Sequence, residues 1–209
     1  IVALHRAVHL ARTNSDSRVL LTTFSDTLAN ALRARLRCLI SSEPSLGERI
    51  EVQSVDAVGD RLFQTNFGTP SIVARSQIRT MIKSASVSVG EHPFSEQFLL
   101  TEWEQVVDAW QLYNWDSYRN VERLGRKTRL PENQREILWS LYAEVRKELA
   151  EQNLITRSEM FGKITDLYRS GQKLPFNHIV VDEAQDVSVA QLRFLAAIGS
   201  QQTQGLFFV

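Results

Sequence analysis

Two adjacent carboxylates follow a short apolar segment near the end of the chain. The segment reads His178-Ile179-Val180-Val181, and Asp182 and Glu183 come directly after it. An apolar run of this length predicts a buried strand, and ligands of open α/β folds bind at the carboxyl ends of such strands. Hydrolysis of a nucleoside triphosphate needs one acid that holds Mg²⁺, usually through water, and one group that orients and deprotonates the attacking water. Asp182 suits the first role and Glu183 the second.

The same acidic residues also have a purely structural interpretation. Asp182, Glu183 and Asp186 precede a predicted helix, where negative charge is favourable near the helix N-terminus. An isolated Asp-Glu pair after a strand fits this interpretation at least as well as a catalytic one. The full string from Val180 to Asp186 is far more restrictive, so it carries the functional hypothesis.

The elements around this segment alternate between strand and helix. Residues 18–24 form an apolar, β-prone run, Ser25 or Asp26 offers an N-cap for a helix, and residues 50–55 predict a second strand. After the strand at 178–181, the capping-box spacing from Ser188 to Gln191 opens a helix, and residues 206–209 predict a last strand. Strand-helix-strand order favours a parallel α/β sheet.

The middle of the chain has a different character, because helical periods dominate between about residues 66 and 172. The clearest lies at 132–152, where apolar residues recur on one face; they are Leu138, Leu141, Tyr142, Val145 and Leu149. We therefore expect an α/β part at 1–65, an all-helical insertion at 66–172 and a second α/β part at 173–209. Trp103, Trp110 and Trp115 belong either to the core of this insertion, which is the more common outcome at helical spacing, or to a platform on which nucleobases stack.

Composition limits the class of protein. Lys and Arg number 24, as do Asp and Glu, so the net charge is zero and a general basic surface for nucleic acid is excluded, whereas a local basic groove is not. The single cysteine, Cys38, excludes a disulfide framework and suits a reducing compartment. No apolar run approaches the roughly 20 residues that span a bilayer, and the first residues do not show the charge, apolar stretch and small residues of a signal-peptide pattern. We expect a cytoplasmic protein without a membrane partner.

The segment Val180-Val181-Asp182-Glu183-Ala184-Gln185-Asp186 resembles the Walker B segment of UvrD/Rep-like superfamily 1 DNA helicases. Residues 20–32 are similar to the segment that follows the phosphate loop in that family, and residues 123–142 to the insertion within its first motor domain. The resemblance implies a P-loop NTPase (RecA-like) parallel sheet, incomplete here, with an all-helical insertion. It also implies an ATP-dependent DNA helicase that uses ATP and Mg²⁺ to move along single-stranded DNA and unwind duplexes, in DNA repair or recombination.

The resemblance also implies roles for individual residues. Asp182 would hold Mg²⁺ through water beside the nucleotide, and Glu183 would be the catalytic base. Gln185 would lie at the interface of nucleotide and DNA and sense the γ-phosphate, while Asp186 would support the loop.

The resemblance implies a DNA-contacting group as well. Thr23, Phe24 and Ser25 would lie against the backbone and a base of single-stranded DNA, although Phe24 could equally be a core residue. Stacking of a base on an aromatic ring is worth roughly 1–3 kcal/mol and is sequence-tolerant. Arg126 and Lys127 belong to a basic run that either neutralises phosphates or forms a solvated face; its members are Arg119, Arg123, Arg126, Lys127 and Arg129.

The chain departs from the family pattern in three respects. It contains no Gly-x-x-x-x-Gly-Lys-Ser/Thr phosphate loop, which we expect just upstream of Ile1, and no second motor domain. Gln53-Ser54-Val55-Asp56 stands where relatives often have Thr-x-His. We therefore expect a fragment with negligible ATPase and no unwinding activity, whose partners are single-stranded DNA, duplex junctions and the second motor domain. The alternatives are a non-catalytic binding or interaction module with the helicase fold, and the motor part of a nuclease-linked repair protein.

Overall fold

The structure is a computed structural model that describes residues 1–13, 15–122, 130–199 and 205–209. It divides into two compact units: a sheet unit, residues 1–68 and 161–209, and a helical unit, residues 69–160. The second boundary falls inside helix α8 (Arg157–Arg169), whereas the sequence predicts it after residue 172. Phe161, the first residue of α8 that belongs to the sheet unit, packs against α9, with 4.9 Å between the ring centroids of Phe161 and Phe194.

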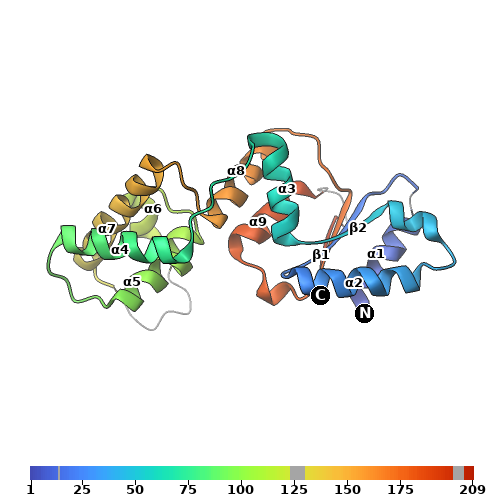
Figure 1. Ribbon diagram of the computed structural model, residues 1–209, viewed down its shortest axis with the longest axis horizontal. Helices are drawn as coiled ribbons and strands as arrows, with labels where there is room; N and C mark the ends of the chain where they lie inside the picture. The colour runs from blue at the N-terminus through green and yellow to red at the C-terminus, as the bar shows by residue number, and fades with distance from the viewer. Residues whose placement is uncertain (14, 123–129, 200–204) are drawn as a thin grey trace. The chain divides into compact units, whose positions relative to one another are not determined.

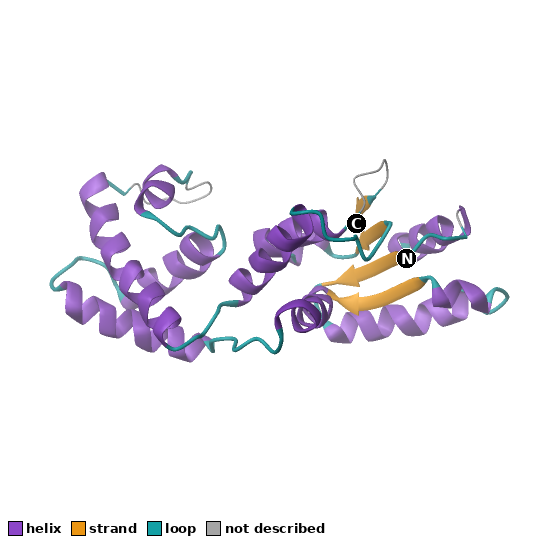
Figure 2. Ribbon diagram, turned by 90° about the horizontal axis from the view of Figure 1, so that it is seen from above, coloured by secondary structure: helices purple, strands orange, loops and turns teal. Residues whose placement is uncertain are grey.

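The described part of the sheet unit contains one four-stranded sheet in the order β2-β1-β3-β4, and every pairing is parallel (Figure 2). Its strands are β1 (Val19–Thr23), β2 (Ile50–Ser54), β3 (His178–Val181) and β4 (Leu206–Phe208). Thr23 pairs with Ser54, and Thr22 with both Gln53 and Val181. The carboxyl ends of the strands therefore meet at one edge, which we call the carboxyl edge. The predicted α/β fold with a parallel sheet is confirmed.

Helices cover both faces of this sheet. In the sheet unit they are α1 (Val2–Thr13), α2 (Asp26–Leu39), the 3₁₀ turn η1 (Pro44–Glu48), α3 (Val55–Phe67), the end of α8, the 3₁₀ turn η3 (Ala184–Asp186) and α9 (Val189–Ile198). Because side chains alternate along a strand, Leu21 and Val180 face α1 and α2 in one core, whereas Leu20 and Ile179 face the opposite side. There Gly199, directly after α9, lies so close that an added Cβ would be 2.9 Å from the Ile179 side chain.

The helical unit packs around α7. Its elements are α4 (Arg75–Val89), α5 (Glu96–Glu102), the π-helical turn η2 (Trp103–Asp108), α6 (Trp115–Asn120), α7 (Glu132–Glu151) and the first turn of α8 (Figure 1). The predicted stripe of α7 is confirmed, because all five of its apolar residues are buried. In the described chain, no helix is both long and apolar enough to cross a membrane.

The tryptophans of the helical unit do not form one exposed platform. Trp103 is only 2% exposed and lies in the core, with its ring 5.7 Å from that of Tyr142. Trp115 is partly buried against the same core, whereas Trp110 is 38% exposed. The interpretation as subdomain core therefore holds for Trp103 and Trp115.

Candidate functional site

Asp182 and Glu183 lie at the carboxyl edge, directly after β3, as the sequence predicted. β3 is an inner strand of the sheet, with β1 on one side and β4 on the other. The Asp182 amide donates to the carbonyl of Thr22 at 2.8 Å, so the ladder between β3 and β1 extends to this residue. Asp182 is half-buried and Glu183 is exposed. Both carboxylates thus follow a rigid strand and stay accessible from solvent.

The acidic loop, residues 182–188, contains an unusual backbone conformation. Glu183 has φ 56° and ψ 49°, the left-handed region that costs a residue other than glycine roughly 1–2 kcal/mol. The next amide, Ala184, donates to the carbonyl of Val209 at 3.1 Å, and the Gln185 side-chain amide donates to the Glu183 carboxylate. Non-glycine residues in this region cluster at functional sites. The strained residue here is the one that the sequence assigned as the base.

The loop after β1 lies beside the acidic loop in the sheet order. Phe24 is 39% exposed, so it is not a core residue. The Ser25 hydroxyl accepts from the Leu28 amide at 3.3 Å and thereby caps α2. An accessible aromatic ring therefore follows β1, and the two carboxylates follow the adjacent strand β3.

Thr23 requires a correction. Its side chain is fully buried, and its hydroxyl, like that of Thr22, has no hydrogen-bond partner among the described residues. Thr23 faces the same side of the sheet as Leu21, where α1 and α2 cover the strands. The expected contact of its side chain with DNA does not fit this burial, and Phe24 and Ser25 remain the surface residues of the loop.

Side-chain contacts at the carboxyl edge join polar residues whose pairing the sequence does not predict. Ser54 caps α3 by accepting from the Ala57 amide at 3.2 Å, and its hydroxyl also donates to Asp26. The Gln191 side-chain amide donates to Asp56 at 2.8 Å. The only signal in the sequence was their position just after strands or in first turns of helices, and nothing there paired residues 135 positions apart.

The surroundings of Asp182 suit a magnesium ion held by one carboxylate and water, and not a metal ion enclosed by several protein ligands. Among the described residues, no three His, Cys, Asp or Glu side chains gather where they could hold a metal. Mg²⁺ keeps several waters and commonly takes one or two carboxylates together with substrate phosphates. A single half-buried carboxylate at a strand end meets this requirement, whereas the sequence has no phosphate loop that would cradle the nucleotide.

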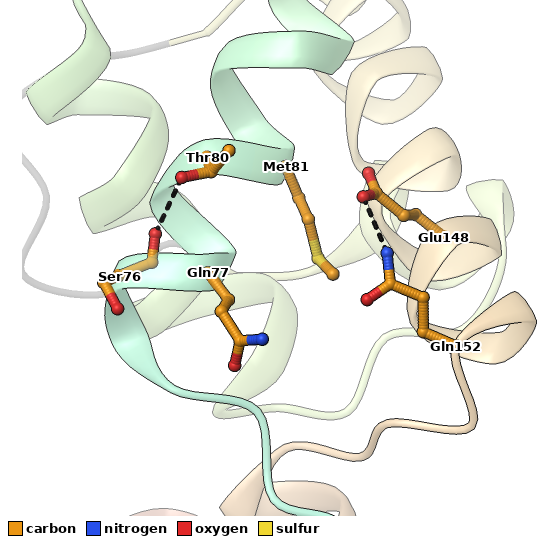
Figure 3. Close-up of a pocket in the computed structure, with 6 residues that line it drawn as sticks. All are labelled: Ser76, Gln77, Thr80, Met81, Glu148 and Gln152. Atoms are coloured by element: carbon orange, nitrogen blue, oxygen red, sulfur yellow. Dashed lines mark hydrogen bonds between the residues drawn. The ribbon is translucent and has the colours of Figure 1, made fainter.

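The basic run and a cavity in the helical unit are weaker candidates for a functional site. Arg126 and Lys127 lie outside the described residues, and Arg119 of the same basic run forms an exposed ion pair with Glu132 at 2.7 Å. A cavity of about 300 Å³ lies between α4 and α7 in the helical unit (Figure 3). Two of its polar side chains bond locally, Thr80 to the Ser76 carbonyl and Gln152 to Glu148. Nothing in this cavity resembles a catalytic arrangement.

Comparison with known proteins identifies the family. A search of curated proteins found no significant match. The family model of the UvrD/REP helicase N-terminal domain, in contrast, matches residues 1–209. Helicases of this family act on DNA and generally use ATP and Mg²⁺. Because the match spans the chain, this protein belongs to the UvrD/REP helicase family, and its residues 1–209 correspond to the N-terminal domain of that family.

Proposed function

We propose that the chain is part of an ATP-dependent DNA helicase that couples hydrolysis of Mg-ATP to movement along single-stranded DNA and to duplex unwinding. The observation that carries this proposal is the position of Asp182 and Glu183. They follow an inner parallel strand, and the neighbouring strand ends at the exposed ring of Phe24. A metal-and-water site and a base-stacking residue at one sheet edge are what such a motor requires. DNA repair or recombination is the process in which we expect it to act.

The acidic loop divides the chemical work among its residues. Asp182 would hold the metal through water, and a bound metal would supply charge neutralisation for the transferred phosphate. Glu183 orients the attacking water and accepts its proton. The Gln185 side-chain amide donates a hydrogen bond to the Glu183 carboxylate. This bond supports a role in which Gln185 orients that carboxylate and senses the γ-phosphate. Asp186 ends the 3₁₀ turn η3 and supports the loop.

The remaining assignments concern DNA and the rest of the motor. Phe24 stacks on a base, Ser25 lies beside it, and Arg126 and Lys127 neutralise phosphates. The helical unit corresponds to the insertion of the first motor domain. A phosphate loop and a second motor domain in the full-length parent complete the nucleotide site.

The substitution Glu183→Gln in the full-length parent tests this function. It removes the proton acceptor and keeps the shape, so kcat of DNA-stimulated ATP hydrolysis should fall by about 10²- to 10⁴-fold, with little change in KM. Glu48→Gln, an exposed residue of η1 in the same unit, is the matched control. Unchanged hydrolysis in Glu183→Gln would refute the assigned role.

The 209-residue chain on its own provides a second test. We expect negligible ATPase, because its sequence has no phosphate-loop lysine. Hydrolysis by this chain that single-stranded DNA stimulates and Glu183→Gln abolishes would contradict the expected inactivity. A full-length parent that binds DNA without hydrolysing ATP would instead favour the non-catalytic binding module.

A further inference from the structure

Gln191, in the first turn of α9, uses both ends of its side chain. The side-chain carbonyl oxygen accepts from the backbone amide of Ser188 at 2.8 Å, which closes the capping box of α9. The side-chain amide donates to Asp56 Oδ1 at 2.8 Å, and Asp56 lies in the first turn of α3. Since α3 follows β2 and α9 follows β3, the bond joins helices that start from two strands flanking β1.

We propose that Gln191 is a positioning residue that fixes the acidic loop by joining its far end to α3. The loop's near end is held by backbone hydrogen bonds, which the Asp182 amide donates to Thr22 and the Ala184 amide to Val209. At the far end of the loop, the Ser188 amide donates to the Gln191 side chain. The bond from Gln191 to Asp56 fixes that side chain in turn. The importance of this role for hydrolysis rests on the proposed function.

The conformation of the loop shows why a second anchor matters. Glu183 occupies the left-handed region, and Glu183, Gln185, Asp186 and Ser188 are all exposed. A strained backbone persists only where the surrounding structure over-determines it. Inside the loop Val187 is buried, and the amides of Asp186 and Val187 donate to the carbonyls of Glu183 and Ala184 at 3.1 and 3.2 Å. These bonds shape the turn itself, whereas the Gln191 bond ties the far end of the loop to α3. That bond is part-buried, so it is less open to competition from water.

A second bond of the same kind extends the link toward Phe24. The Ser54 hydroxyl caps α3 and donates to Asp26, in the first turn of α2. The starts of α2, α3 and α9 are thus joined in sequence by two side-chain hydrogen bonds. Gln191 therefore connects the acidic loop to α2, the helix that begins two residues after Phe24.

The chain offers a test in which donor and acceptor are exchanged. Gln191→Glu keeps an oxygen for the Ser188 amide, because Glu also serves in a capping box, but it loses the donor and sets a carboxylate against Asp56. Combined with Asp56→Asn, the new amide at position 56 can donate to the new carboxylate, so the bond returns with reversed polarity. Gln134→Glu is the matched control, since Gln134 is also the third residue of its helix, α7.

The first readout is amide hydrogen exchange of the loop, followed by NMR on the 209-residue chain. We expect exchange at residues 183–188 to be faster by about tenfold or more in Gln191→Glu, and to return close to wild type in the double variant. Gln134→Glu should leave these amides unchanged. If Gln191→Glu unfolds the chain, Asp56→Ala removes the acceptor without adding a charge and should give the same pattern more weakly. Wild-type exchange in the folded single variants, or a double variant no better than Gln191→Glu, would overturn the proposal.

The second readout separates this proposal from the proposed function. Mn²⁺, which takes the same oxygen ligands as Mg²⁺, broadens the amide signals of residues 182–186 when it binds near Asp182. We expect half-maximal broadening to need a higher Mn²⁺ concentration in Gln191→Glu than in wild type. In the double variant this concentration should return close to the wild-type value. If wild type shows no broadening while the exchange results hold, the positioning role stands, and Asp182 does not hold the metal without the phosphates of a nucleotide.

Discussion

Removal of the Phe24 ring is the most direct probe of the DNA-binding assignment. A base that stacks on an aromatic side chain gains about 1–3 kcal/mol, so Phe24→Ala should raise the Kd for single-stranded DNA by about 5- to 160-fold. Phe24 is 39% exposed and follows β1. The substitution should therefore cost less stability than the roughly 3–5 kcal/mol of a fully buried Phe→Ala change.

Fluorescence anisotropy with a labelled oligo-dT measures this effect, first at low salt, where phosphate contacts are strongest. Because Phe24 carries no charge, Phe24→Ala should shift the Kd at every salt concentration without changing the slope of log Kd against log salt. Phe67→Ala is the control, since Phe67 is 48% exposed in the same unit but lies at the far end of α3. An unchanged Kd in a folded Phe24→Ala variant, or equal weakening by Phe67→Ala, would refute the reasoning.

Two further predictions concern stability. The Thr22 hydroxyl is buried and has no hydrogen-bond partner among the described residues, and Thr22→Val replaces it by a methyl group of the same shape. The free energy of unfolding, measured by urea titration, should therefore rise by about 1–3 kcal/mol. Thr165→Val is the control and should not raise it, because it breaks a hydrogen bond of 2.8 Å from the Thr165 hydroxyl to the Phe161 carbonyl. Burial raises the pKa of Asp108 above its ordinary value of 3.8, although Thr156 and Arg146 oppose this shift. The stability that this carboxyl contributes is therefore present below its ordinary pKa and is lost as pH rises through the raised pKa. Asp108→Asn removes that dependence. The unfolding free energy of wild type minus that of the variant should therefore fall as pH rises above the ordinary value of 3.8, and a flat or rising difference would contradict the prediction.

Local sequence patterns were sufficient for the four strands, for α2, α7 and α9, and for the position of the acidic loop. The β-prone run before Asp182 predicted β3, and parallel order placed the two carboxylates at the carboxyl edge. The capping box from Ser188 to Gln191 and the apolar stripe of α7 are confirmed in the structure. These features depend on residues within one or two turns or within one strand, so the sequence contains all the information that they need.

Only the tertiary structure decided which of these side chains is accessible and which contacts distant segments. Thr23 and Phe24 are neighbours with similar sequence signals, yet one is fully buried and the other exposed, because α1 and α2 cover the face of the sheet toward which Thr23 points. The bond between Asp56 and Gln191 joins residues 135 positions apart. Burial and long-range pairing depend on how strands and helices assemble in space, and no local periodicity encodes that arrangement.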